Sequence, residues 1–269
     1  MEKEQAMAMT SGAALVTGGG KRLGRAMIED LAAAGWAVAI HCNGSEEEAA
    51  ALAAKIAAAG GTAAVVQADL MDEAATDTLI ARAAAALGRP LTLLVNNASI
   101  FEHDAMGTMT RTSWDRAFDS NLRAPMMLTQ AFAAQAPRAE IDEDGLPRAR
   151  ACVVNMIDQR VLKPTPEFLS YGVAKAGLWA FTRMAAQGLS PDIRVNAIGP
   201  GPTLQGVRQS KGHFDAQRAA TLLKRGAGPA DICAGLRYIL AADGLTGQML
   251  ALDGGQHLIW RTADVQGLE

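Results

Sequence analysis

Short apolar runs alternate along the chain with stretches in which apolar residues recur every three or four positions. A short apolar run bounded by turn residues is typical of a buried strand, and the longer spacing places apolar residues on one face of a helix. The runs that predict strands are Gly12–Thr17, Trp36–His41, Thr62–Gln67, Leu91–Val95, Cys152–Ile157, Asp192–Ile198 and Leu250–Leu252. This order predicts an α/β fold: one doubly wound, Rossmann-type parallel sheet of seven strands, with helices on both faces.

The segments between these runs predict the helices and two irregular stretches. Pro137–Arg150 is charged and predicts a surface loop, and Thr203–His213 has no clear period and predicts a mobile loop over a site. The expected helices are 23–34, Glu46–Ala59, an Ala-rich helix ending at Leu87, Ser113–Gln135, a helix from Tyr171 to about Gly188, Asp215–Lys224 and Pro229–Ala241. We expect one domain over residues 11–260, with tails at 1–10 and 261–269.

Composition excludes several classes of protein. The chain of 269 residues is 49% hydrophobic, which is enough to bury a sizeable core. No apolar run approaches the roughly 18 residues of a membrane helix, and the N-terminal residues lack the hydrophobic centre of a signal peptide. The net charge is −3 without a basic block, which argues against nucleic-acid binding. A small-molecule substrate is therefore the expected partner.

Cysteine and histidine spacing predicts neither disulfides nor a metal site. Three cysteines are far apart, so reduced thiols in a cytoplasmic protein are expected. The histidines at 103, 213 and 257 have no spacing suited to a metal, and we expect isolated surface side chains.

A glycine-rich turn, Thr17-Gly-Gly-Gly-Lys21-Arg22-Leu23-Gly24, separates the first expected strand from the first expected helix. Glycines let the backbone approach a pyrophosphate, and a helix N-terminus offers free N–H groups and a positive dipole end. The required strand and helix surround this turn, which favours dinucleotide binding. A tight turn without a ligand is the alternative.

The end of the second strand bears on the type of dinucleotide. NAD-binding folds place an acidic residue here for the ribose 2′-hydroxyl, but this chain has no acid between His41 and Glu46. Lys21, Arg22 and Ser45 would instead suit a 2′-phosphate, which predicts NADP(H). The two basic residues would equally suit a solvated turn. Ser45 would also suit a helix N-cap, with Glu48 completing a capping box.

Asp158, Tyr171 and Lys175 are the candidate catalytic residues. On a helix, Tyr171 and Lys175 share one face, one turn apart. An ammonium beside a phenol favours the phenolate, so the Tyr171 proton would be exchanged nearer neutral pH. Asp158 follows a buried strand, thirteen residues before Tyr171, and could reach the same cleft. Tyr-x-x-x-Lys alone occurs by chance, so its weight comes from its surroundings.

Two further polar residues, Asn121 and Asp69, are candidates for a function. Asn121 falls in the middle of an expected helix, where asparagine competes for backbone hydrogen bonds. This hints at a function, although a solvent-facing side chain is the alternative. Asp69, before Leu70 at the end of the third strand, is either a helix cap or an adenine contact.

From Ala13 to Leu258 the chain resembles a short-chain dehydrogenase/reductase. Several motifs carry the resemblance, in the family's order: Thr17-Gly18-x-x-x-x-x-Gly24, Asn96-Asn97-Ala98, Asn121, Tyr171-x-x-x-Lys175, Pro200-Gly201 and Asp253-Gly254-Gly255. Two departures from the family's usual motifs narrow the resemblance to a subgroup. The family usually has a glycine where this chain has Arg22, and a serine where it has Asp158. Together they are similar to the pteridine reductases and the dihydromonapterin or dihydrobiopterin reductases.

Asn97-Ala98-Ser99-x-Phe101 also resembles that subgroup. The resemblance implies that Phe101 stacks a pterin against the nicotinamide and that Ser99 bonds its polar edge, with Arg22 touching both cofactor phosphate and pterin. Phe101 as a plain core or lid residue is the alternative. Gly44 stands where several pteridine reductases have an arginine near the 2′-phosphate, which counts against NADP(H) without reversing that prediction.

The implied reaction is hydride transfer from NADPH to a pterin C=N bond. Tyr171 would protonate the ring nitrogen, Lys175 would hold the nicotinamide ribose, Asp158 would bind the pterin edge or feed the proton path, and Asn121 would anchor a water. By resemblance, the cofactor contacts are Gly18, Lys21, Arg22, Leu23, Gly24, Ser45, Asp69, Leu70, Asn97, Ala98, Tyr171, Lys175, Pro200 and Gly201. A homotetramer is also implied. Two other functions stay open: a ketone or alcohol substrate, and a non-catalytic NADP(H) sensor.

Overall fold

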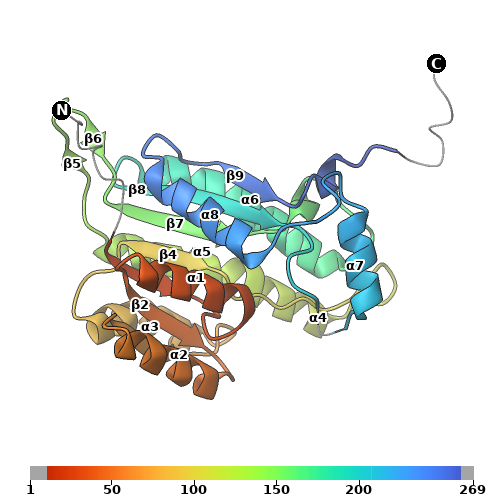
Figure 1. Ribbon diagram of the computed structural model, residues 1–269, viewed down its shortest axis with the longest axis horizontal. Coiled ribbons are helices and arrows are strands. Elements are labelled where there is room, and N and C mark those ends of the chain that lie inside the picture. The colour runs from red at the N-terminus through yellow and green to blue at the C-terminus, as the bar shows by residue number, and fades with distance from the viewer. Residues whose placement is uncertain (1–10, 207, 262–269) are drawn as a thin grey trace.

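Seven parallel strands form the centre of the structure, a computed structural model that describes residues 11–206 and 208–261 (Figure 1). The strands are β1 (Ala13–Val16), β2 (Ala37–Cys42), β3 (Ala63–Gln67), β4 (Leu93–Asn96), β7 (Ala151–Met156), β8 (Ile193–Pro200) and β9 (Met249–Leu252). Their order is β3-β2-β1-β4-β7-β8-β9, and every neighbouring pair is parallel. The predicted doubly wound sheet is confirmed. The expected tails, except Arg261, lie outside the described residues.

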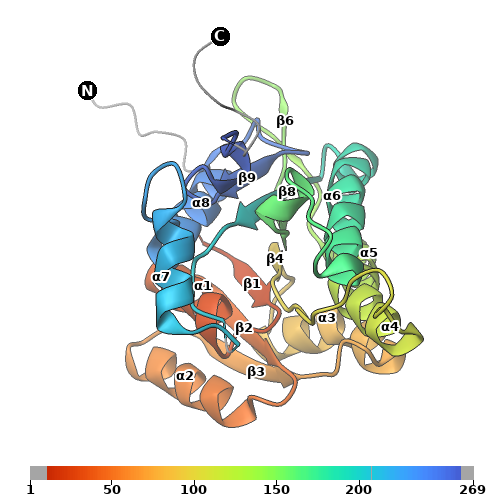
Figure 2. The ribbon, with the colours of Figure 1, turned by 90° about the vertical axis from the view of Figure 1, so that its right-hand side faces the viewer.

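Helices cover both faces of this sheet, as the view along its edge shows (Figure 2). On one face lie α1 (Arg22–Ala33), α2 (Glu46–Ala58) and α8 (Pro229–Ala241). On the other lie α3 (Glu73–Leu87), α5 (Ala124–Gln135) and α6 (Leu169–Leu189). Central strands such as β1 and β7 are buried along their whole length because both of their faces are covered, which explains their continuous apolar sequences.

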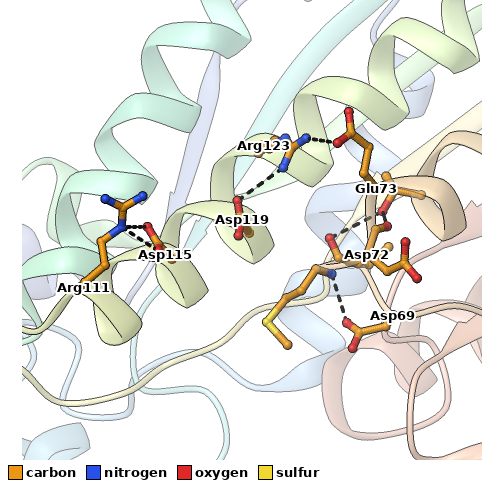
Figure 3. A network of polar contacts seen from close by, with 10 residues as sticks. Asp69, Asp72, Glu73, Arg111, Asp115, Asp119 and Arg123 are labelled. Atoms are coloured by element: carbon orange, nitrogen blue, oxygen red, sulfur yellow. Dashed lines mark hydrogen bonds and ion pairs between the residues drawn. The ribbon is translucent and has the colours of Figure 1, made fainter.

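The helix expected over Ser113–Gln135 is divided into three parts. It consists of α4 (Arg111–Phe118), a π-helical turn (Asp119–Arg123) and α5. π-Turns inside α-helices insert one extra residue and are frequent at functional sites. Arg123, at the end of the turn, bonds Glu73 of α3 over 2.7 Å and lies 3.8 Å from Asp119 (Figure 3).

Two other expectations need correction. The segment expected as a surface loop contains a small hairpin of β5 (Glu140–Ile141) and β6 (Pro147–Arg148). The helix expected from Asp215 to Lys224 is α7 (Lys211–Ala219), four residues earlier at its start. The helix begins earlier because Ser210 caps it: the Ser210 hydroxyl accepts a hydrogen bond from the backbone N–H of His213. The spacing of apolar residues does not reveal such a cap.

The crossover between β3 and β4 creates the place for a site. β1 pairs with β2 on one side and with β4 on the other, so the chain reverses its direction across the sheet at β1. Loops at the carboxyl ends of the strands diverge at such a point, where α/β sheets bind ligands.

In the part of the chain that the structure describes, no helix is long and apolar enough to cross a membrane. All three cysteines are free and buried.

Candidate active site

The glycine turn after β1 is held closely against the segment after β4. Gly18 has a φ of +63°, and a Cβ at Gly24 would lie 2.1 Å from the Gly18 carbonyl oxygen. The Thr17 hydroxyl oxygen accepts hydrogen bonds from the backbone N–H groups of Asn97 and Ala98, at 2.8 and 2.9 Å. The Asn97 side chain in turn donates to the Thr17 carbonyl, at 2.8 Å. Only glycine permits this approach at positions 18 and 24.

His41, near the end of β2, binds the backbone of the glycine turn. The backbone N–H of Gly18 donates to His41 Nδ1 at 3.0 Å, and His41 Nε2 lies 3.1 Å from the Ala68 carbonyl oxygen. Burial lowers the pKa of His41 to about 4, so its ring is neutral, with the proton on Nε2. Sequence reasoning missed this role. The available signal was a polar residue ending a buried apolar strand.

Lys21 and Ser45, which were expected at a 2′-phosphate, lie at the glycine turn and at the start of α2. Lys21 Nζ lies 2.6 Å from Glu48 Oε1, and both side chains are about half exposed. Ser45 is the N-cap residue of α2, but its side chain makes no capping hydrogen bond, so the predicted capping box is wrong. Its hydroxyl oxygen lies 3.2 Å from where a Cβ of Gly20 would be. Glu48 pairs with the Lys21 ammonium instead of completing the capping box, and the Ser45 hydroxyl lies beside Gly20 of the turn.

Two arginines attach the segment after Pro202 to the glycine turn and to the segment after β4. Arg22 has a left-handed backbone, with φ of +53°, where the family usually has glycine. Its guanidinium donates to the carbonyls of Gln205 and Leu204, at 2.9 and 3.2 Å. Arg208 donates to the Phe101 carbonyl at 2.5 Å. This segment therefore bridges the glycine turn and the segment after β4.

Tyr171 and Lys175, in the first two turns of α6, meet Asp158 at the end of β7. The Tyr171 hydroxyl donates to Asp158 Oδ2 at 2.9 Å, and Asp158 Oδ1 accepts from the backbone N–H of Arg160 at 2.8 Å. Lys175 Nζ donates to the Met156 carbonyl at 2.8 Å and lies 5.7 Å from the centre of the Tyr171 ring. The structure thus brings the carboxyl, phenol and ammonium groups together.

The charges of these groups differ from the expectation in one respect. Burial, and then the Asp158 carboxylate, raise the pKa of Tyr171 well above its ordinary value, so the predicted lowering by Lys175 is wrong. Burial also raises the pKa of Asp158 and lowers the pKa of Lys175 to about 8. At neutral pH the phenol keeps its proton and is a hydrogen-bond donor.

Asn121 lies inside the π-turn and is fully buried, which excludes the solvent-facing alternative. Its amide group donates to the carbonyls of Ile100 and Ala117, both at 2.9 Å. Its Oδ1 accepts from the Ser99 hydroxyl at 2.7 Å. The Ser99 hydroxyl is also close enough to Tyr171 to lower the pKa of that phenol. Ser99 thus connects the π-turn with the phenol.

An aromatic cluster stands over the Tyr171 phenol. The rings of Phe101 and Phe168 are stacked, with centroids 4.1 Å apart, and the rings of Phe101 and Tyr171 are nearly perpendicular, with centroids 4.7 Å apart. The Arg160 guanidinium lies 5.7 Å and 5.1 Å from the Phe101 and Phe168 ring centres. Phe101 is 42% exposed, so it is not a core residue. Sequence reasoning missed Phe168 and Arg160, which carry no motif.

Asp69 is not the helix cap that one interpretation suggested. Its Oδ1 accepts from the backbone N–H of Met71 at 3.0 Å, and Asp72 caps α3 by accepting from Ala74 N–H at 2.9 Å (Figure 3). The carbonyl of Leu70 accepts from the Thr76 hydroxyl. A contact of Asp69 and Leu70 with an adenine stays a prediction.

The Pro200-Gly201 turn packs on the last strand's turn. A Cβ at Gly201 would lie 2.6 Å from the Cβ of Asp253, so this crossing requires glycine. Asp253 is buried, and its carboxylate accepts from the backbone N–H groups of Gly255 and His257, both at 2.8 Å. Asp253 therefore fixes the turn beside the cleft.

The expectation of isolated histidines is wrong for two of the three. His257 Nδ1 lies 2.7 Å from Asp253 Oδ2, and His103 pairs with Glu167. Across residues 11–206 and 208–261, no three His, Cys, Asp or Glu side chains are grouped to hold a metal ion.

The chain is similar to known proteins along most of its length. The crystal structure of FolM Alternative dihydrofolate reductase 1 from Brucella canis complexed with NADP is 43% identical, with a TM-score of 0.89 over 97% of this chain and all of that one. The Probable galactose dehydrogenase GalD of Rhizobium meliloti is 34% identical over 90% of this chain and 93% of its own length. The 3beta-hydroxysteroid dehydrogenase 1 of Eggerthella lenta is 32% identical over 91% and 93%. The family model described as short chain dehydrogenase matches residues 12–215, and the chain therefore belongs to the short-chain dehydrogenase family of oxidoreductases.

Proposed function

We propose that the protein is an NADPH-dependent reductase of a pterin-like C=N bond, converting a dihydropterin to a tetrahydropterin. The observation that carries the proposal is the 2.9 Å hydrogen bond from Tyr171 to Asp158, beside the exposed ring of Phe101. The Brucella canis relative supports it, because it is described as a dihydrofolate reductase and is complexed with NADP.

The side chains in the cleft suit a flat heterocycle that is rich in nitrogen. Phe101 offers an aromatic face, and the carboxyl of Asp158 offers an acceptor for ring N–H groups. An ionised carboxylate repels the negative charge that develops on a carbonyl oxygen during ketone reduction. Asp158 in place of the family's usual serine therefore favours a C=N bond over a C=O bond.

The residues around the phenol provide the proton. Bound NADPH supplies a hydride to the carbon of the C=N bond. Tyr171 holds its proton at neutral pH and gives it to the ring nitrogen, directly or through water. The Lys175 ammonium, 5.7 Å from the Tyr171 ring centre, stabilises the negative charge left on the phenolate and binds the nicotinamide ribose. The carboxyl of Asp158 binds the pterin edge and accepts or returns protons.

The loops at the carboxyl ends of β1, β2, β4 and β8 fit a dinucleotide. The glycine turn leaves no room for a Cβ at Gly24, and the Ser45 hydroxyl makes no capping bond. The Lys21–Glu48 pair is exposed, and such pairs are worth only about 0–1 kcal/mol, so a 2′-phosphate can compete for Lys21. The proposed cofactor residues are Gly18, Lys21, Arg22, Leu23, Gly24, Ser45, Asp69, Leu70, Asn97, Ala98, Tyr171, Lys175, Pro200 and Gly201.

NADPH oxidation tests the proposal, with quinonoid or 7,8-dihydropterins in one series and simple ketones in the other. We expect turnover with dihydropterins. Tyr171→Phe should bind NADPH normally and lose about 10²–10⁴-fold in kcat, because it removes the proton donor. Lys55→Ala, at an exposed ion pair with Glu29, is a matched control that should leave kcat unchanged. Turnover of ketones alone would reject the pterin substrate.

A carbonyl or alcohol substrate is the second candidate. It is favoured by the Tyr171 phenol, which keeps its proton at neutral pH and could donate it to a carbonyl oxygen. The names of the galactose and hydroxysteroid dehydrogenase relatives agree with it. In the same assay, cofactor binding without turnover on either series would favour an NADP(H) sensor.

We also propose that the protein is a cytoplasmic homotetramer. The helices after β4 and β7 carry partly exposed apolar residues that a partner subunit would cover: Trp114, Met126, Val173 and Met184. Light scattering measures the mass directly. The paired substitutions Val173→Asp and Met184→Asp should reduce the assembly, and a wild-type monomer would contradict the proposal.

A further inference from the structure

Helix α6, which carries Tyr171 and Lys175, begins without a cap from its own sequence. Its N-cap residue, Phe168, has a left-handed backbone, with φ of +58°, and gives no side-chain hydrogen bond to the first turn. The first N–H groups of a helix need partners from elsewhere. Here the partner is Asp104, from the segment after β4: its carbonyl accepts from Leu169 N–H at 3.1 Å and its Oδ1 from Ser170 N–H at 3.0 Å.

The carboxylate of Asp104 joins two helices. Its Oδ2 accepts from the Ser170 hydroxyl at 2.5 Å and from the Ser113 hydroxyl, in the first turn of α4, at 3.2 Å. Asp104 is only 3% exposed. Burial by itself would raise the pKa of Asp104, but the hydrogen bonds from Ser170 and Ser113 hold it below its usual value. The charge is therefore kept at the positive ends of both helix dipoles.

The position of Asp104 in the chain connects this cap with the substrate side of the cleft. Asp104 lies three residues after Phe101, whose ring meets Tyr171. Ser170, which Asp104 binds through both its N–H and its hydroxyl, directly precedes Tyr171. A displacement of Asp104 would thus change the distance between the aromatic face and the phenol.

We propose that Asp104 is a positioning residue for the reaction: as the remote cap of α6, it fixes Tyr171 relative to Phe101. The proposal concerns the placement of the phenol and holds for either a pterin or a carbonyl substrate. It goes beyond the proposed function because it assigns a role to a buried charge outside the proposed catalytic and binding residues.

The chain contains only two tyrosines, which permits a direct test. Tyr238 lies on α8 and is 57% exposed, so Tyr238→Phe leaves Tyr171 as the sole tyrosine of the protein. In that background, NMR of ¹³C-labelled tyrosine reports on Tyr171 alone, without any substrate. We expect Asp104→Ala to shift or broaden this signal. We expect Ser113→Ala to change it less, because this variant loses the bond between Asp104 and α4 and the Thr110–Ser113 capping box but keeps both bonds between Asp104 and Ser170.

Activity provides the second readout. A displacement of about 1 Å can cost about 100-fold in rate, so Asp104→Ala should lower kcat by about that factor and leave the KM for NADPH unchanged. Asp104→Asn, which keeps an acceptor for Ser170 N–H, should recover part of the loss. In a Tyr171→Phe background, Asp104→Ala should have no further effect on the residual rate.

Three results would overturn the proposal. They are an unchanged Tyr171 signal in folded Asp104→Ala, an equal shift in Ser113→Ala, and the same fractional loss of rate with and without Tyr171. If Asp104→Ala does not fold, Ser170→Ala takes its place, because it removes the 2.5 Å bond and keeps the backbone bond. An unchanged Tyr171 signal in that variant would equally count against the proposal.

Discussion

The Tyr171 hydroxyl donates its hydrogen bond to Oδ2 of Asp158 over 2.9 Å, so the proton donor of this site is bound to a carboxylate. A negative neighbour and deep burial both favour the neutral phenol, and the pKa of Tyr171 is raised accordingly. The phenol therefore keeps its proton at neutral pH, as the proposed protonation of a ring nitrogen requires.

Asp158→Ser should lower the pKa of Tyr171, because it removes the negative neighbour. A folded-state pKa above the unfolded value means that stability is lost as pH rises above about 10, and this loss should be smaller in the variant. Tyrosinate absorbance in the Tyr238→Phe background measures the titration. An unchanged titration would show that Asp158 has no influence on the phenol.

Affinity for NADPH should fall as pH rises through about 8. The Lys175 ammonium has a pKa of about 8, and its positive charge attracts an anionic ligand only while it is protonated. Titration of NADPH fluorescence at a series of pH values measures this. Lys175→Met should bind more weakly and show no change of affinity around pH 8, and a wild-type affinity that is flat across this range would contradict the prediction.

Arg208→Ala should raise the KM for the proposed dihydropterin substrate about fivefold, since one hydrogen bond to a carbonyl contributes about 1 kcal/mol. The arginine attaches its segment to Phe101, on the substrate side, so the KM for NADPH should stay within twofold of wild type by the same estimate. Arg138→Ala, at an exposed ion pair with Asp192, is the control. Equal effects of the two variants would refute a role for the bridge.

Gly24→Ala should lower the stability of the protein by about 1–3 kcal/mol and weaken NADPH binding, because the new methyl group overlaps the Gly18 carbonyl. Gly244→Ala is a matched control, since no atom lies within 4 Å of its new Cβ and the residue lies outside the proposed cofactor site. Thermal unfolding and NADPH titration compare the two. A Gly24→Ala protein with normal unfolding and binding would show that the turn adapts.

The fold could be predicted from the sequence because its signals are local and repeat along the chain. Apolar runs such as Cys152–Ile157 became buried strands, and the glycine turn lies where a strand meets a helix. The long helix after β4 was less predictable. Its apolar period continues through Asp119–Arg123, where the structure has a π-turn built around Asn121, and the polar residue was the only signal.

The site was predictable where residues belong to motifs and unpredictable where they act through contacts between distant segments. Asp158, Tyr171 and Lys175 were identified from spacing, and the structure brings them together. Asp104 and His41 were missed. Asp104 caps a helix from a distant segment and His41 binds the backbone of the glycine turn, and such contacts are known only when the segments are placed in space. The direction of the pKa shift of Tyr171 was wrong for a similar reason, since burial outweighs the nearby ammonium.

His41 also limits how the coenzyme preference of this protein can change. In relatives that use NAD, an acid at the end of the second strand selects the cofactor by its ribose, and a single replacement there invites a switch. Here His41, one residue before β2 ends at Cys42, accepts from the Gly18 N–H, and its Nε2 lies 3.1 Å from the Ala68 carbonyl oxygen. Replacing His41 to favour NADH would remove its bond to the glycine turn, so a redesign should begin at the proposed 2′-phosphate residues Ser45 and Lys21 and leave the imidazole in place.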